Sequence, residues 1–491
     1  MRDGPGARWE LLAILAVATA LRLPGCFQAL WLDEVWTLLE VERMGSALEI
    51  LTGLHDSNNH HLNTAIFYLV GSQEHWSLYR LHSLVAGVAT VALAWAIARP
   101  AGRLEARLAA ALTTLSYPLI HFSSEARGYA LALLFAFASF LALRSFLETR
   151  RWLAALAFGI AILLGFASHL AMLYVLLASA VWLGVELWRC DPRPAAVATG
   201  LARCFALPAL LLLPFYIVAI APMKIGQAPL RDLGEVLLST ASQSAGGPAD
   251  GVLVAPVALL MASLTLGAIV FLQRARRAEW LFYLIVIGLA PALLLAALRP
   301  DYLALRYYLI PIGFALVALA APLAEGWRRR GGARLGVGLL LLLFCIGNAQ
   351  SVAKLYAHGR GGYLEALRFI TESTPGGHVT IASDHDFRNH LLVHYYQRFL
   401  PPGENLTYLK QHRLPPEGSD WMIAHRLGER AELPAKFRDP RGNRYVLEKR
   451  YPYAGLSGMH WYLYRRTATG AAVPGAPEPG ERGAASRSLA P

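Results

Sequence analysis

Long apolar segments separated by short basic connections make up the first 352 residues of the chain. A helix of roughly 20 mostly apolar residues is long enough to cross a lipid bilayer. The pattern predicts about eleven such spans, at 9–29, 80–98, 105–121, 128–147, 152–168, 170–188, 202–220, 252–272, 279–298, 303–323 and 334–352. The apolar stretch from Leu62 to Gly71 is too short to cross, and predicts a re-entrant or interfacial piece.

The pattern changes after Ala353. Amphipathic helices are predicted at 362–372 and 389–399, and strands at 378–382, 421–424, 445–449 and 460–464. We therefore expect an α-helical polytopic membrane domain over 1–352 and a small α/β soluble domain over 353–466. Residues 467–491 are rich in Ala, Gly, Pro and Ser, and predict a disordered tail.

Composition supports this division. Of the 491 residues, 56% are hydrophobic and only 16% are charged, whereas soluble domains carry about 25% charged residues. The net charge is +12, but the arginines form short clusters between apolar segments, as membrane loops do. The expected partner is therefore the lipid bilayer and not a nucleic acid.

The arginines also predict an orientation. With a cytoplasmic N-terminus, the arginines fall on alternate connections, which is the positive-inside pattern. They are Arg99, Arg103, Arg107, Arg144, Arg150, Arg151, Arg189, Arg193, Arg203, Arg274, Arg276, Arg277, Arg328, Arg329, Arg330 and Arg334. An odd number of spans then places the C-terminal domain outside, at the periplasmic or extracellular face of a bacterial inner membrane. Two long external connections follow, at 30–79 and 221–251.

An acidic pair, Asp33 and Glu34, follows Trp31 and Leu32 just after the first span. Held within hydrogen-bond reach, the carboxylate of Asp33 would take a proton from an acceptor hydroxyl as a general base. Glu34 would then assist it or coordinate a metal. The alternative is an acidic pair at a helix N-terminus, stabilised by the helix dipole.

A second polar group on the same connection contains His55, Asp56, Asn59, His60 and His61. Clustered His and Asp side chains either bind a divalent metal or form hydrogen bonds to a sugar. We favour substrate binding; a divalent metal is possible, and no cofactor is certain. The alternative is a polar loop that ends where the short apolar stretch begins.

Glu125, Arg127 and Tyr129 stand at another external boundary. The planar fork of an arginine suits a phosphate. The alternative is interfacial snorkelling, with the tyrosine in the aromatic belt.

Arg299, Arg306 and Tyr307 lie on a short external connection, where arginines break the positive-inside trend. They predict a site for an anionic head group such as a lipid-linked phosphate, to which Lys224 would contribute. The alternative is an ion pair between Arg299 and Asp301 that fixes the turn.

These features, in this order, resemble the GT-C superfamily of membrane glycosyltransferases, and within it the bacterial branch related to protein O-mannosyltransferases and lipid A aminoarabinose transferases. The resemblance covers roughly residues 9–325. The matching pieces are Trp31-Leu32-Asp33-Glu34, Asn59-His60-His61-Leu62, Glu125-Ala126-Arg127-Gly128-Tyr129 and Arg306-Tyr307. Many relatives have a proline soon after the Asn-His pair, where this chain has His61.

The resemblance implies a GT-C-type fold and the transfer of a hexose or pentose from a polyprenyl-phosphate donor. The acceptor would be a lipid, polysaccharide or protein of the cell envelope, and Asp33 would be the catalytic base. The main alternative is a transporter or flippase of lipid-linked glycans, which would need polar residues deep within the spans. A non-catalytic membrane scaffold would explain the topology but not the polar residues gathered at one face.

Overall fold

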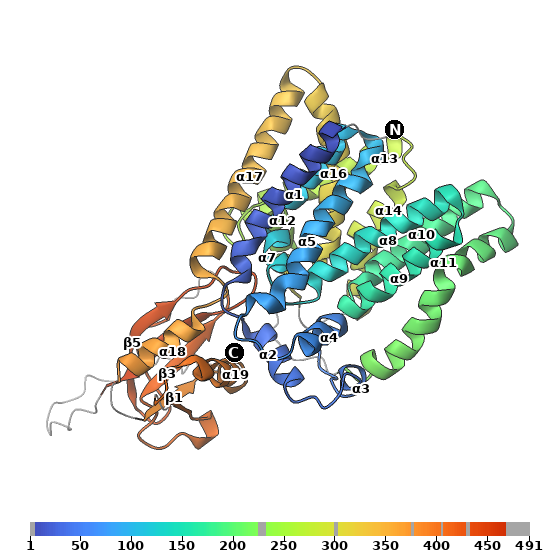
Figure 1. Ribbon diagram of the computed structural model, residues 1–491. Coiled ribbons are helices and arrows are strands. Elements are labelled where there is room, and N and C mark those ends of the chain that lie inside the picture. Colours follow the sequence, from blue (N-terminus) through green and yellow to red (C-terminus); the bar gives the residue numbers. More distant parts are fainter. Residues whose placement is uncertain are drawn as a thin grey trace, which may run out of the picture. The chain divides into compact units, whose positions relative to one another are not determined.

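The computed structural model describes residues 5–223, 232–298, 303–374, 378–403, 406–428 and 433–467 (Figure 1). Within these residues the chain forms two compact units. The first contains 5–28 and 40–356, and the second contains 29–39 and 357–467. The boundary expected at residue 352 lies within a helix that continues to His358, and a short N-terminal segment belongs to the second unit.

The first unit is helical. Its helices are α1 (Pro5–Cys26), α3 (Glu49–Thr52), α4 (His61–Val70), α5 (Ser77–Ala98), η1 (Arg99–Ala101), α6 (Arg103–Leu115), α7 (Tyr117–Ser123), α8 (Tyr129–Thr149), α9 (Trp152–Ser168), α10 (Met172–Cys190), α11 (Pro194–Phe215), η2 (Tyr216–Ile220), α12 (Leu233–Ser244), α13 (Val254–Arg274), α14 (Trp280–Leu284), η3 (Ile285–Leu289), α15 (Ala290–Leu298), η4 (Leu305–Tyr308), α16 (Leu309–Arg328) and α17 (Gly332–His358). The short helix α4 matches the stretch that the sequence showed to be too short to cross.

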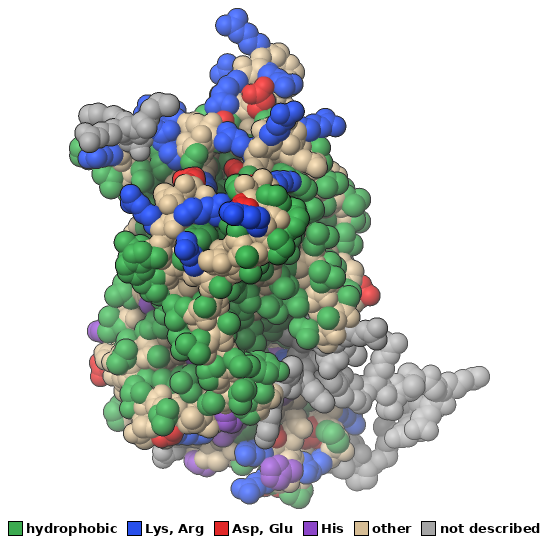
Figure 2. Space-filling view, turned by 90° about the vertical axis from the view of Figure 1, so that its right-hand side faces the viewer, with side chains coloured by type: hydrophobic (Ala, Val, Ile, Leu, Met, Phe, Trp, Pro, Cys, Tyr) green, Lys and Arg blue, Asp and Glu red, His purple; other side chains and the backbone are tan. Residues whose placement is uncertain are grey.

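Nine helices in the described part of the chain are long and apolar enough to cross a membrane. They correspond to nine of the eleven expected spans. The other two expected spans, 105–121 and 152–168, contain α6 with 13 residues and α9 with 17 residues. Large apolar side chains cover the outside of the unit, among them Leu210, which is 71% exposed. Figure 2 shows a broad hydrophobic belt on this face of the molecule, with the Lys and Arg side chains gathered outside the belt.

Helix α6 stops short of a full span because of a proline. It ends at Leu115, and Ser116 has an extended backbone with ψ of 116°. Pro118 follows, near the start of α7. Pro118 has no N–H to donate to the carbonyl oxygen of Thr114, four residues earlier, and its ring crowds that carbonyl group. The last carbonyl groups of α6 are therefore left without their usual helical partners.

A buried arginine of α1 bonds to these carbonyl groups. Arg22 is 1% exposed, and its guanidinium donates to the carbonyl oxygens of Thr113 at 2.9 Å and Thr114 at 3.2 Å. On the other side of the break, the Tyr117 N–H donates to Asn348 Oδ1 of α17 at 2.6 Å. Backbone groups at membrane depth must be satisfied within the protein, so these two side chains allow the helix to break.

The second unit is built on a six-stranded sheet with the order β2-β1-β3-β6-β5-β4. The strands are β1 (Val379–Ser383), β2 (Leu406–Tyr408), β3 (Trp421–Arg426), β4 (Lys436–Arg438), β5 (Arg444–Tyr451) and β6 (His460–Arg466), and the helices are α2 (Leu32–Val41), α18 (Tyr363–Glu372) and α19 (Asp386–Tyr396). β1 runs parallel to β2 and β3, and the remaining pairs are antiparallel. The sheet therefore confirms the expected small C-terminal domain, with β2 and β4 added.

The segment 29–39 is part of the core of this second unit. The hydroxyl of Tyr396 donates to the Leu30 carbonyl oxygen at 2.5 Å. The ring of Trp36 meets that of Phe387 edge-on, with centroids 4.9 Å apart. Val35 is fully buried. These contacts anchor α2, and with it the acidic pair, to the helix that follows β1.

Candidate functional site

Six residues of the first unit form a cluster of rings and guanidinium groups, which we call the His–Arg cluster. It contains His60, Arg127, Tyr129, His169, Arg306 and Tyr307. They come from the loop before α4, the start of α8, the α9–α10 connection and η4. Five of the six were predicted from the sequence as site residues, and the sixth, His169, was not among them.

The rings form a continuous stack. His60 lies on His169 with centroids 5.0 Å apart and meets Tyr129 edge-on at 5.0 Å. Tyr129 lies 5.1 Å from His169, which in turn stacks on Tyr307 at 5.8 Å. A single packed group of aromatic and imidazole rings therefore joins the four chain segments.

The two arginines flank this stack. The guanidinium of Arg127 lies 5.9 Å from the centroid of Tyr129, and that of Arg306 lies 5.7 Å from the centroid of Tyr307. Arg127 Nη1 also donates to the carbonyl oxygen of Asn58 at 2.9 Å. This bond ties α8 to the loop that carries His60.

Burial and the two arginines keep the histidines neutral. Burial lowers the pKa of His60 well below its usual value, and the charge of Arg127 lowers it further. Burial lowers the pKa of His169 to about 3, with Arg127 and Arg306 adding to the effect. The cluster thus presents two cations and two neutral imidazoles. The N–H of His60 is directed at the Ser168 carbonyl oxygen, whereas His169 Nδ1 accepts from the Ala171 N–H, so that its proton lies on Nε2. This set of donors suits an anion such as a phosphate.

Gly128 makes this arrangement possible. A Cβ at this position would lie 1.9 Å from the carbonyl oxygen of Ser168 and 2.8 Å from His60 Nδ1. His60 Nδ1 itself lies 2.9 Å from that same carbonyl oxygen. Only a residue without a side chain lets the start of α8 approach the end of α9 this closely.

Asn59 and Asp56 fix the loop before α4. Asn59 Nδ2 donates to the carbonyl oxygens of Ile50 at 3.0 Å and Leu54 at 3.1 Å, and its Oδ1 accepts from Thr64 at 2.8 Å. Asp56 Oδ1 accepts from the Asn58 N–H at 2.8 Å. These bonds assign both side chains a role in holding the backbone that presents His60.

His61 points to a different neighbour from His60. Its ring meets Phe215 edge-on at 4.8 Å, and burial, followed by the nearby His55, lowers its pKa to about 4. Glu125 is fully buried, with Oε2 lying 3.6 Å from His121 Nε2. The structure therefore groups these predicted residues beside the His–Arg cluster and not among its stacked rings.

The acidic pair lies in the first turn of α2, in the second unit. Glu34 is fully buried and its Oε2 accepts from the Trp31 N–H at 3.0 Å. This is the backward half of a capping box. Asp33 is half-buried, and burial together with the carboxylates of Glu34 and Asp33 raises the pKa of Tyr363. Glu34 therefore caps the helix, and Asp33 is the more exposed carboxylate of the pair.

Lys224 and Arg299 lie outside the described residues. No group of three or more His, Cys, Asp or Glu side chains that could hold a metal occurs in the described part of the chain. The possible divalent metal thus has no assigned ligands.

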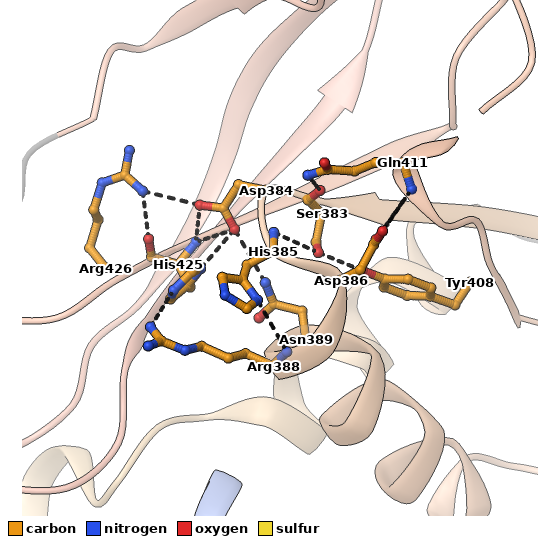
Figure 3. A network of polar contacts seen from close by, with 10 residues as sticks. All are labelled: Ser383, Asp384, His385, Asp386, Arg388, Asn389, Tyr408, Gln411, His425 and Arg426. Atoms are coloured by element: carbon orange, nitrogen blue, oxygen red, sulfur yellow. Dashed lines mark hydrogen bonds and ion pairs between the residues drawn. The ribbon is translucent and has the colours of Figure 1, made fainter. Parts of the chain in front are cut away.

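A second polar network, which sequence reasoning missed, lies at the carboxyl ends of β1 and β3 (Figure 3). Asp384 Oδ1 lies 2.8 Å from His425 Nδ1, and Asp384 Oδ2 lies 3.1 Å from Arg426 Nη1. Arg388 Nη1 approaches the other imidazole nitrogen at 3.1 Å. Asn389 donates to Asp384 at 3.2 Å. One carboxylate thus joins both strands to α19.

The network continues to β2. Ser383 Oγ lies 2.6 Å from the hydroxyl of Tyr408, which donates to Asp386 at 3.0 Å. The sequence did hold one sign of this network: polar residues come at the ends of the strands predicted at 378–382 and 421–424, which form the parallel neighbours β1 and β3. Ligands of open α/β sheets often bind at such an edge, where the chain leaves adjacent strands in opposite directions.

No family model and no curated protein matches the chain. Among solved structures it is similar to the apo oligosaccharyltransferase of Archaeoglobus fulgidus, with a TM-score of 0.48 and 12% identity over 81% of this chain and 60% of that one. It is also similar to AglB from the same organism, in complex with an inhibitory peptide and a dolichol-phosphate, with a TM-score of 0.46 and 11% identity over 86% of this chain and 69% of that one.

A third similar structure is ArnT from Cupriavidus metallidurans in the apo state, with a TM-score of 0.46 and 13% identity over 86% of this chain and 93% of that one. The chain spans 60% of the length of the first of these structures. At these identities and TM-scores the likeness assigns neither a family nor an activity to the chain.

Proposed function

We propose that this protein is a membrane glycosyltransferase of the GT-C type. It moves a sugar from a polyprenyl-phosphate donor to a lipid, polysaccharide or protein acceptor at the periplasmic face of a bacterial inner membrane. The observation that carries the proposal is the His–Arg cluster, in which Arg127 and Arg306 flank two neutral histidines. Moving a lipid-linked phosphate out of the membrane would expose its apolar chain to water at a large free-energy cost. The site that binds it must therefore belong to a membrane domain.

The reaction breaks the bond between the sugar C1 and the phosphate oxygen, and the electron pair stays on that oxygen. Arg127 and Arg306 would stabilise the phosphate as this negative charge develops. Lys224 and Arg299 are proposed to contribute positive charge to the same anion.

Asp33 would accept the proton of the acceptor hydroxyl as the new C1–O bond forms. Solvent exposure supports Asp33 over its neighbour, because Asp33 is only half-buried whereas Glu34 is fully buried. His55, Asp56, His61 and Glu125 are proposed to shape the substrate site by supporting the loop and the helix around the cluster.

The experiment uses the full-length protein in nanodiscs with a polyprenyl-phospho-sugar and an envelope acceptor fraction. Loss of a general base typically costs about 10²–10⁴-fold in rate, so Asp33→Asn should reduce product by that amount. The matched control is Glu74→Gln, an exposed carboxylate on the same external connection. Equal activity of the Asp33 and Glu74 variants would refute the role of Asp33.

Two further arms test the rest of the proposal. Arg127→Gln should weaken donor binding, measured by retention of the polyprenyl-phospho-sugar. A chelator arm, with Mn²⁺ or Zn²⁺ added back, tests for a divalent metal. Movement of the donor across a vesicle membrane without any glycosylated product would instead support a transporter or flippase.

A further inference from the structure

A cavity of about 610 Å³ lies where three helix ends of the first unit meet. It is lined by the C-terminal ends of α8 and α10 and by the N-terminal end of α11. Ligand sites typically have volumes of about 300–1,000 Å³. α8 begins at Tyr129 in the His–Arg cluster and ends at this cavity after 21 residues, or about 30 Å. The cavity is therefore a site separate from the His–Arg cluster, at the opposite end of α8.

The cavity exists because α11 touches its neighbours along a narrow line. The buried residues of α11 are Gly200, Cys204 and Pro208, spaced four apart and so on one edge of the helix. At the N-terminal end of this line, a Cβ on Gly200 would lie 2.5 Å from a methyl group of Leu187 in α10. The helices touch at this glycine and leave a wedge beside it.

Positive charge lines the wedge. Arg150, Arg193 and Arg203 face it together with one carboxylate, Asp191, so the lining carries a net charge of 3 − 1 = +2. The carboxylate pairs with Arg193, with 2.6 Å between Oδ2 and Nη2. Arg150 lies over the ring of Phe146, 5.8 Å from its centroid. Arg150 and Arg203 thus line the wedge together with apolar side chains such as Phe146 and Leu187.

We propose that this cavity binds the phosphate of an anionic phospholipid. A lipid fits better than free phosphate because the adjoining surface is apolar and exposed, as at Trp188 of α10 and Leu210 of α11. Acyl chains would lie along these two helices while the phosphate meets the arginines. Basic pockets between membrane helices bind anionic head groups in this way. In the topology that the sequence predicts, this is the cytoplasmic leaflet.

The test is native mass spectrometry of the delipidated full-length protein in detergent, titrated with phosphatidylglycerol or phosphatidylcholine. We expect phosphatidylglycerol to be retained and phosphatidylcholine not. Each arginine near an anionic head group contributes about fivefold in affinity, so Arg203→Gln should weaken retention about fivefold. The matched control is Arg274→Gln, an exposed arginine at the end of α13 and outside the cavity lining.

A second variant separates shape from charge. Ala196→Phe fills the cavity with a bulky ring while keeping every arginine, and should also weaken retention of phosphatidylglycerol. Equal binding of the two lipids, or unchanged binding in both cavity variants, would overturn the proposal. Competition by millimolar inorganic phosphate as effective as that by the lipid would overturn the assignment to a lipid. None of these readouts depends on sugar transfer, so the result is independent of the function proposed above.

Discussion

Replacing Gly128 with alanine should disrupt the point where α8 meets α9. The backbone of Gly128 has φ −70° and ψ −5°, which alanine adopts without strain. The substitution therefore tests space alone. The new methyl carbon would lie 1.9 Å from the carbonyl oxygen of Ser168, where ordinary contact begins at about 3.4 Å. The two segments must separate by about 1.5 Å, the difference between these distances.

This separation costs stability because neither partner moves freely. The Ser168 carbonyl belongs to the end of α9, and His60 bonds to the same oxygen. Overpacking of this kind costs about 1–3 kcal/mol. A displacement of about 1 Å near reacting groups reduces turnover by about 100-fold, so sugar transfer should fall even where the protein still folds.

The assay is thermal unfolding in one detergent, with Gly184→Ala as the matched control. Gly184 lies in α10, and a Cβ there meets nothing within 4 Å. Alanine in place of a helical glycine gains about 0.5–1 kcal/mol, so the control should be slightly stabilised. If Gly128→Ala and Gly184→Ala unfold at the same temperature, the proposed close approach of α8 and α9 is wrong.

Three other changes test the structure. Arg22→Leu leaves two backbone carbonyls at the break of α6 without donors and should lower the free energy of unfolding by about 2–5 kcal/mol. Arg22→Lys should restore part of this loss, and unchanged thermal unfolding of Arg22→Leu would contradict the reasoning. Because the pKa of His169 is lowered to about 3 in the folded protein, this histidine is protonated only in the unfolded chain between about pH 6.5 and pH 3. Thermal stability should therefore fall as the pH drops from 6.5 towards 3, and His169→Gln should make the decline shallower; equal slopes would argue against a buried neutral imidazole. Asp384→Asn weakens bonds to His425 and Arg426 and should lower the free energy of unfolding by about 2–4 kcal/mol. Unchanged protease resistance of the C-terminal unit would show that Asp384 does not hold β1, β3 and α19 together.

The sequence by itself determined the membrane character of the first unit. Runs of about twenty apolar residues form helices in a bilayer whatever their neighbours, because the backbone must satisfy its own hydrogen bonds. The same local logic predicted that the stretch forming α4 is too short to cross, and it predicted the main strands of the C-terminal sheet. It failed at 105–121, where a single proline ends the helix and the rescuing donor, Arg22, comes from another helix.

Local patterns also singled out polar residues, but the contacts of these residues depended on packing. Asn59 and Glu34 were candidates for substrate chemistry, and the structure shows both bonded to backbone groups. For Glu34, the alternative of an acidic residue at a helix N-terminus is what the structure shows. The bonds of Asn59 depend on how the loop before α4 folds, which residue spacing does not reveal.

Only the tertiary structure decided which residues meet. His60 and Arg306 are separated by 246 positions, yet the charge of one acts on the other. His169 joins them because α9 and α10 turn there. The acidic pair belongs to the same compact unit as the C-terminal sheet, although more than 300 positions separate the two in the sequence. Such contacts follow from how helices and strands pack, which hydrophobic periodicity does not encode.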